Sequence, residues 1–116
     1  MKITRIETVQ SKRPIALPEA WRPAWNEPDV APQTTTRFCF LKVHTDEGIV
    51  GIGPSSGPVS PFVESTVLGQ DPAYIQRFWD INMRGRGSTL GARTRGGLEI
   101  ALWDIVGKAA GQPVYK

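Results

Sequence analysis

The chain is short of the residues that disulfides and most metal sites require. It has one cysteine, Cys39, among 116 residues, which excludes an internal disulfide and a cysteine-based zinc cluster. A single histidine, His44, excludes a metal site with two histidine ligands. No apolar run approaches the roughly 20 residues that a membrane helix needs, and no apolar segment follows the charged N-terminus. We therefore expect neither a membrane span nor a signal peptide, and we expect a protein of the reducing cytoplasm.

The rest of the composition predicts one folded domain over residues 1–116. Hydrophobic residues make up 40% and charged residues 22%, which is ordinary for a globular protein of a length that can bury a core. The net charge of +3 is too small to indicate a partner. Glycine and proline are in excess, with 12 and 10 residues, and their clusters predict where the loops lie.

The hydrophobic pattern predicts strands first and helices afterwards. We expect strands over residues 2–12 and 34–45, and a short third strand over residues 49–53 that forms a hairpin with the second through a turn at Gly48. This order predicts an α+β fold, in which a three-stranded antiparallel meander is followed by helices that pack on it.

Three helical segments are expected in the second half of the chain. The first is one or two turns over residues 62–68, and the second runs from Pro72 to near Met83, with Asp71 as its N-cap. The third covers residues 95–110. Its apolar spacing predicts a core-facing stripe made of Leu98, Ala101, Leu102, Ile105 and Ala109.

A proline-rich segment between the first two strands is the most suggestive candidate site. Five prolines between residues 14 and 32 predict a long loop. Within it, Trp21 and Trp25 flank Arg22 and precede Asn26, and this group could close over a small anion that Arg22 binds through two hydrogen bonds. The alternative is that the two tryptophans only anchor the loop to its own domain.

Other chemically interesting residues favour structural roles. No two carboxylates have a spacing that places both in one pocket, and His44 and Cys39 are interpreted as a surface or hydrogen-bonded histidine and a small buried hydrophobe. The arginines and glycines of residues 84–87 and 93–97 could contact single-stranded nucleic acid, but the tract is short and has no interleaved aromatics. A flexible connection with solvated or interface arginines is favoured, so nucleic acid is an unlikely partner.

The C-terminal segment carries a family resemblance. The sequence ALWDIVGKAAGQPVY over residues 101–115 closely resembles the end of the N-terminal domain of the enolase superfamily, in the branch of mandelate racemase and muconate lactonizing enzyme. Residues 1–7, 43–53 and 68–72 resemble other segments of the same family, in the same order. Together these segments extend over most of the chain, and the glycines and arginines before the last helix look most like those of the acid-sugar dehydratases.

The resemblance implies a capping domain whose catalytic partner is a (β/α)₇β barrel. In the family, the barrel follows a Pro-Val-Tyr segment and carries the Mg²⁺ carboxylates and the acid and base groups. No residue of this chain matches a metal ligand or a catalytic group, so we expect the chain alone to be inactive. The complete enzyme is expected to form homo-oligomers and to abstract a proton α to the carboxylate of a small acid, with an enediolate stabilised by Mg²⁺.

The same resemblance assigns substrate-capping roles to two loops. One is the proline-rich loop, and the other follows the third strand; the capping residues would be Trp21, Arg22, Trp25, Asn26, Ser55 and Ser56. Two departures affect the second loop: Gly53-Pro54 stands where many relatives have Gly-Glu, and the segment over residues 59–68 is shorter than the usual helix. The alternatives are a stand-alone binding module with the same fold and a small nucleic-acid binder.

Overall fold

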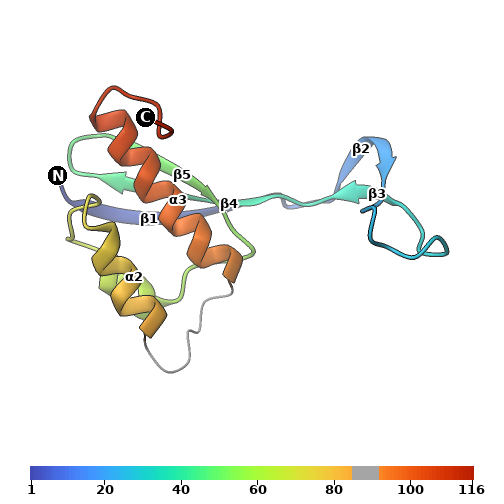
Figure 1. Cartoon of the computed structure of the whole chain (residues 1–116), viewed down its shortest axis with the longest axis horizontal. Helices are drawn as coiled ribbons and strands as arrows, with labels where there is room; N and C mark the ends of the chain where they lie inside the picture. The colour runs from blue at the N-terminus through green and yellow to red at the C-terminus, as the bar shows by residue number, and fades with distance from the viewer. Residues whose placement is uncertain (85–91) are drawn as a thin grey trace.

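The structure is a computed structural model that describes residues 1–84 and 92–116. Strands β1 (Ile3–Gln10), β4 (Cys39–Thr45) and β5 (Val50–Pro54) form an antiparallel sheet in the order β1-β4-β5. Helices α1 (Pro61–Val67), α2 (Ile75–Arg84) and α3 (Ala92–Ala109) follow the sheet in the chain, and α3 crosses in front of β4 and β5 (Figure 1). The predicted α+β fold with its three-stranded sheet is therefore confirmed.

A second, two-stranded sheet lies between β1 and β4 in the chain. β2 (Ile15–Trp21) lies within the predicted loop over residues 14–32, so the loop prediction was wrong there, and it pairs antiparallel with β3 (Gln33–Thr36). The strand predicted over residues 34–45 is interrupted after Thr36 and forms both β3 and β4. Pro18 lies between the paired positions Ala16 and Trp21, where the register shifts, and the missing proline N–H therefore leaves no ladder position unpaired. The two strands form a ribbon at the end of an arm that stands away from the main body (Figure 1).

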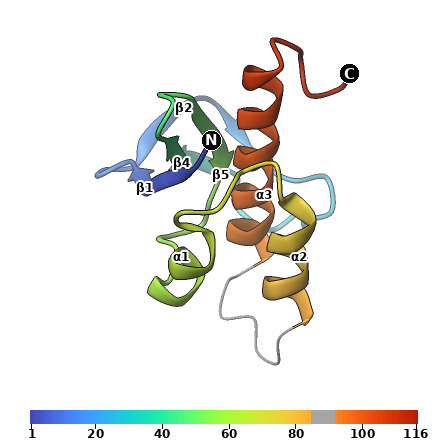
Figure 2. The same cartoon turned by 90° about the vertical axis from the view of Figure 1, so that its left-hand side faces the viewer.

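The helices begin and end close to the predicted places, except that α2 begins three residues later than predicted and α3, at Ala92, three residues earlier. Residues 71–74 form a turn, in which the side chain of Asp71 accepts a hydrogen bond from the Ala73 N–H at 3.0 Å and its carbonyl accepts one from the Tyr74 N–H at 3.0 Å. Because this turn uses Asp71 locally, α2 begins at Ile75, and the predicted start at Pro72 was wrong. Figure 2 shows α2 and α3 side by side, with α1 next to them.

The core fills the space between the sheet and the helices. Leu98, Ala101, Leu102 and Ile105 of α3 are buried as predicted, whereas Ala109 is exposed, because the helix passes beyond the sheet before its last turn. The buried apolar residues from the rest of the chain are Ile3, Leu41, Val43, Val63, Val67, Ile75 and Phe78. This core holds α3 firmly against the strands that position the candidate site.

Glycines allow the backbones of α3 and β5 to touch. A methyl group added to Gly97 would overlap the carbonyl oxygen of Pro54, and one added to Gly53 would overlap the carbonyl oxygen of Gly97. A third contact of this kind joins Gly51 to the Ala101 carbonyl. No residue with a side chain could occupy these positions without moving the helix from the sheet.

The open edge of the sheet is covered by a pair of charged residues on α3. Asp104 accepts a hydrogen bond from the Ile52 N–H at 2.9 Å, and the Lys108 amine donates one to the Val50 carbonyl at 2.7 Å. The two side chains also form an ion pair with each other at 2.6 Å. Since unpaired strand edges invite pairing with other chains, this arrangement protects β5 and fixes α3 along it.

Candidate functional site

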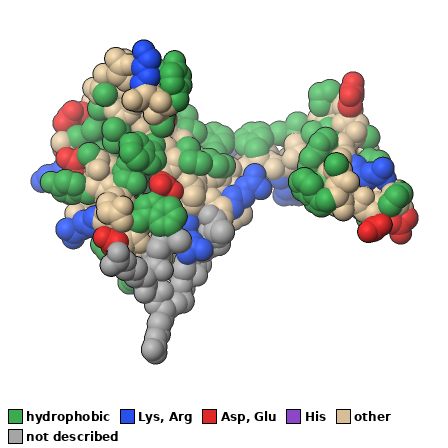
Figure 3. Space-filling view, in the orientation of Figure 1, with side chains coloured by type: hydrophobic (Ala, Val, Ile, Leu, Met, Phe, Trp, Pro, Cys, Tyr) green, Lys and Arg blue, Asp and Glu red, His purple; other side chains and the backbone are tan. Residues whose placement is uncertain are grey.

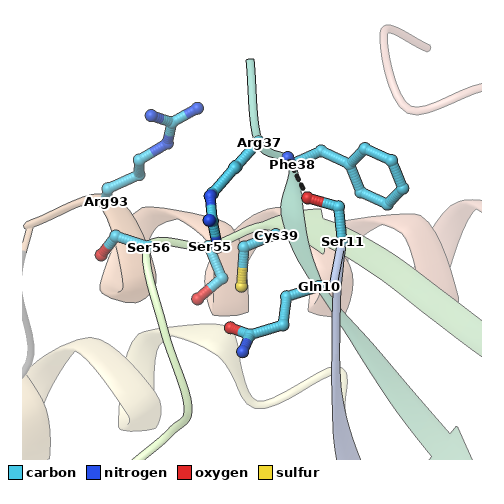
Figure 4. A pocket seen from close by; sticks show the side chains of 8 residues that line it. All are labelled: Gln10, Ser11, Arg37, Phe38, Cys39, Ser55, Ser56 and Arg93. Atoms are coloured by element: carbon cyan, nitrogen blue, oxygen red, sulfur yellow. Dashed lines mark hydrogen bonds between the residues drawn. The ribbon is translucent and has the colours of Figure 1, made fainter. Parts of the chain in front are cut away.

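A polar pocket lies where the arm joins the main body. Its volume is about 240 Å³. Its lining comes from the end of β1, the start of β4, the loop after β5 and the first turn of α3, and consists of Gln10, Ser11, Arg37, Phe38, Cys39, Ser55, Ser56 and Arg93 (Figure 4). The pocket therefore sits between the two segments to which the family resemblance assigned capping roles.

The neck of the arm is held by paired hydrogen bonds. Ser11 donates its N–H to the Phe38 carbonyl at 3.0 Å, and its hydroxyl accepts a hydrogen bond from the Phe38 N–H at 3.3 Å (Figure 4). On the other side of β4, the Ser55 N–H donates to the Cys39 carbonyl at 2.9 Å. These bonds fix the backbone on both sides of Arg37 and Cys39, so the pocket wall is built on a continued sheet rather than on a free loop.

Three hydroxyl groups join the loop after β5 to α3. The Thr94 oxygen lies 3.2 Å from the Ser55 oxygen and 3.0 Å from the Ser56 oxygen, and Thr94 and Ser55 are both 3% exposed. The Ser55 hydroxyl also donates to the Gly57 carbonyl at 2.6 Å. Ser55 therefore has a positioning role, whereas Ser56 is exposed and lines the pocket while its hydroxyl is bonded to Thr94.

The charge in the pocket comes from two arginines. Figure 4 shows the side chain of Arg37 extending toward Ser55, with Arg93 at the edge of the pocket. None of the residues that line the pocket is acidic. Cys39 is half-buried and contributes to the lining, so its interpretation as a buried core residue was wrong. The pocket can therefore bind a small anion with several hydroxyl groups nearby.

The four predicted capping residues of the proline-rich segment lie on the arm, away from this pocket. Arg22 donates a hydrogen bond to the Pro28 carbonyl at 2.7 Å, and the Asn26 N–H donates to the Pro23 carbonyl at 3.1 Å. These bonds shape the connection between β2 and β3.

Both tryptophans on the arm are open to solvent. Trp21 is 53% exposed and Trp25 is 83% exposed, and Figure 3 shows the arm separated from the main body by a thin neck. This exposure does not favour the alternative in which the tryptophans anchor the segment to its own domain. The structure brings Ser55 and Ser56 together with Arg37, but it does not bring them together with Trp21 or Trp25.

Sequence reasoning missed five polar residues around the pocket: Gln10, Ser11, Arg37, Arg93 and Thr94. Arg93 was noted only as part of a glycine- and arginine-rich connection. The signal for Arg37 was the pairing between the second and third predicted strands, because an antiparallel register extended beyond Phe40 and Pro54 places residue 37 near the loop that follows the third strand. The hydrophobic pattern of one strand does not show which residues of another strand lie opposite it.

The residues with possible ligand or acid-base chemistry have other partners. The Nε2 atom of His44 lies 3.1 Å from the Glu7 carboxylate and 3.1 Å from the Arg5 guanidinium, which confirms its interpretation as a hydrogen-bonded histidine. Across residues 1–84 and 92–116, no three His, Cys, Asp or Glu side chains are placed to hold a metal ion. The magnesium implied by the family does not fit the described residues, and no step through a metal is derived from them.

Membrane insertion through a helix is not indicated in the described part of the chain. None of the helices there combines the length and the apolar character that crossing a membrane requires.

The fold and the order of the segments define a capping domain of the enolase type, and comparison with known proteins gives the family. Residues 19–116 match the family described as mandelate racemase / muconate lactonizing enzyme, N-terminal domain. The match extends over most of the chain, so the chain belongs to this family.

Individual relatives agree with this assignment. A D-galactonate dehydratase from Pectobacterium atrosepticum is 43% identical over 91 residues, which cover 69% of this chain and 24% of that enzyme. A Roseovarius nubinhibens protein of the mandelate racemase/muconate lactonizing enzyme group, solved in complex with magnesium, is 26% identical, with a TM-score of 0.69 over 98% of this chain and 32% of that one.

The fold also extends to more distant enzymes. A dipeptide epimerase from Enterococcus faecalis, solved with Mg and the dipeptide L-Leu-L-Tyr, has a TM-score of 0.71 at 20% identity and covers 99% of this chain and 34% of that one. At that identity the likeness concerns the fold alone. The chain spans about a quarter of the length of the curated relatives it matches.

Proposed function

We propose that this chain is the substrate-capping domain of an enolase-superfamily enzyme that dehydrates an acid sugar. The enzyme would abstract the proton α to the carboxylate of its substrate and expel the hydroxyl group from the neighbouring carbon. The observation that carries this proposal is the 43% identity to a D-galactonate dehydratase, within a domain whose family is established. Because the chain spans 24% of that relative, the reacting groups would lie in a barrel outside this chain.

The chain's own contribution is to cover and select the substrate. The arm carries two exposed indole rings and a guanidinium group, which together suit a sugar acid whose carbons present apolar faces and whose oxygens accept hydrogen bonds. Closing this arm over the barrel would exclude water from the reaction. We propose that Trp21, Arg22, Trp25 and Asn26 act in this way, with Ser56 contacting substrate from the second loop and Ser55 holding that loop in place.

Magnesium would bind in the barrel and would stabilise the enediolate there. The 116-residue chain alone is therefore proposed to be inactive. We further propose that the complete enzyme is a homo-oligomer.

The proposal is tested with the complete gene product and a panel of acid sugars. Loss of water from such a substrate produces a 2-keto-3-deoxy acid, which can be measured by reaction of its carbonyl group with semicarbazide. Turnover of at least one acid sugar that depends on added Mg²⁺ is the expected result. Absence of turnover across the panel, with magnesium bound and the protein folded, would contradict the dehydratase assignment. A gene product that contains no barrel and binds no magnesium would favour a stand-alone binding module.

A further inference from the structure

The two arginines of the pocket have positive charge without a counter-charge. Arg37 lies between β3 and β4, and Arg93 lies in the first turn of α3, yet both line the same cavity. No ion pair within the described residues involves either guanidinium. Two positive charges on one cavity that has no acidic lining residue favour an anionic group as its ligand.

The backbones that carry both arginines are fixed by hydrogen bonds. Arg37 is followed by Phe38, which is held by two bonds to Ser11, and Arg93 is followed by Thr94, whose buried hydroxyl lies 3.0 Å from that of Ser56. The backbone positions of both arginines are therefore fixed before a ligand arrives, which lowers the entropy lost on binding to that of the two exposed side chains.

The space in the pocket suits the end of a sugar acid. Its volume of about 240 Å³ is several times the roughly 30 Å³ that one water molecule occupies in the liquid. The side-chain amide of Gln10 adds a polar group that can bind a hydroxyl next to the anionic group (Figure 4).

We propose that Arg37 and Arg93 bind an anionic group at the end of the substrate that is far from the reacting carboxylate. This inference rests on the proposed function. The reacting carboxylate must lie beside the metal and the base, and no group of ligands for a metal exists among the described residues. The positive charge on the capping domain therefore meets the opposite end of the molecule. The substrate class is a sugar acid with a charge at both ends, rather than an aldonic acid such as D-galactonate.

Kinetics with three kinds of acid test this assignment in the complete enzyme. The substrates are a six-carbon aldaric acid with two carboxylates, the aldonic acid D-galactonate with one, and a 6-phosphorylated aldonic acid. The variants are Arg37→Gln and Arg93→Gln. Arg5→Gln serves as the control, because it removes an exposed guanidinium from β1 that does not line the pocket. Thermal melts of all variants establish that the fold is retained.

The expected result is a clear preference for an acid with two charged ends. Whether the aldaric or the phosphorylated acid is preferred identifies the second anionic group as a carboxylate or a phosphate. Replacing either pocket arginine should lower kcat/KM for that acid by about 10- to 100-fold, as expected for a lost charge-assisted hydrogen bond, and should change kcat/KM for D-galactonate less than about threefold. Arg5→Gln should change neither.

Two other results would contradict either this inference or the proposed function. If D-galactonate is turned over as well as the acids with two charged ends, or if the pocket variants lower kcat/KM equally for all three, the inference is wrong and the dehydratase proposal stands. If the unaltered enzyme dehydrates none of the acids, the proposed function itself is wrong.

Discussion

Two adjacent glycines of α3 allow a sharp test of how the helix lies on the sheet. A methyl group on Gly97 would overlap the carbonyl oxygen of Pro54, whereas a methyl group on Gly96 would meet no atom within 4 Å. Both residues lie inside α3, so both substitutions by alanine bring the same gain in helix propensity, about 1 kcal/mol. The difference between the two variants therefore isolates the contact between α3 and β5.

The magnitudes follow from this geometry. Gly96→Ala should raise the free energy of unfolding by about 0.5–1 kcal/mol. In Gly97→Ala the obstacle is backbone rather than a flexible side chain, so the helix must move away from β5. Overpacking of this kind costs about 1–3 kcal/mol or more, and displacing the helix also exposes the buried stripe around Ala101 and Leu102. Because both variants share the propensity gain, we expect Gly97→Ala to be less stable than Gly96→Ala by about 2 kcal/mol.

The assay is urea unfolding of the 116-residue chain, followed by circular dichroism at the helix band, with Gly96→Ala as the matched control. Near the transition, a difference of about 2 kcal/mol corresponds to a difference in Tm of about 8 °C for a domain of 116 residues. Equal stability of the two variants would refute the close contact between α3 and β5, and with it the position of the pocket wall that α3 contributes.

Three further predictions concern the core, the N-terminus and the arm. Leu102→Ala should lower the free energy of unfolding by about 2–5 kcal/mol in the same urea assay, because Leu102 is 2% exposed; a loss below about 1 kcal/mol would show that the stripe does not face the core. The Met1 amine lies 3.2 Å from Glu47, whose hydrogen bond and charge raise the pKa of the amine above its ordinary value of 8.0. The ion pair between Met1 and Glu47 therefore stabilises the fold fully below about pH 8, and this contribution is lost as the pH rises through the raised pKa. In Glu47→Gln, NMR titration should show that the pKa of the amine returns toward its ordinary value. Arg22→Ala should lower kcat/KM of the complete enzyme, by an amount that corresponds to about 1–3 kcal/mol of lost transition-state stabilisation, and should leave Tm unchanged. An equal loss of folding stability would show that Arg22 has a structural role.

The strands and the last helix could be predicted because their signals are local. The apolar residues around Leu41 and Val43 predict a strand, and the spacing of Leu98, Leu102 and Ile105 predicts a buried helix face. The apolar residues on both sides of that strand also suggested burial of both faces, which was wrong, because only the face of Leu41 and Val43 is buried. Each pattern repeats over a few residues and depends only on which side of the element faces the core.

The β2–β3 ribbon and the pocket could not be predicted in the same way. Prolines argue against strands in general, and only the irregular register around Pro18 makes them compatible with β2. The pocket depends on contacts between distant parts of the chain: Ser11 with Phe38, and Ser56 with Thr94. A single sequence carries no record of such pairings, and Arg37 was missed for this reason. Ser55 and Ser56 were predicted as candidates only through the family resemblance.

The capping role is the central claim, and shortening the arm tests it most directly. Residues 13–36 can be replaced by an Asn-Gly turn, because Ser11 and Phe38 are already hydrogen-bonded across the neck and a two-residue turn can join antiparallel strands. The measurement is kcat/KM of the complete enzyme for its acid-sugar substrate, with magnesium affinity measured alongside. We predict a loss of about 100-fold or more in kcat/KM with unchanged magnesium binding, since the substrate loses its cover and its positioning groups. An unchanged kcat/KM would contradict the capping role.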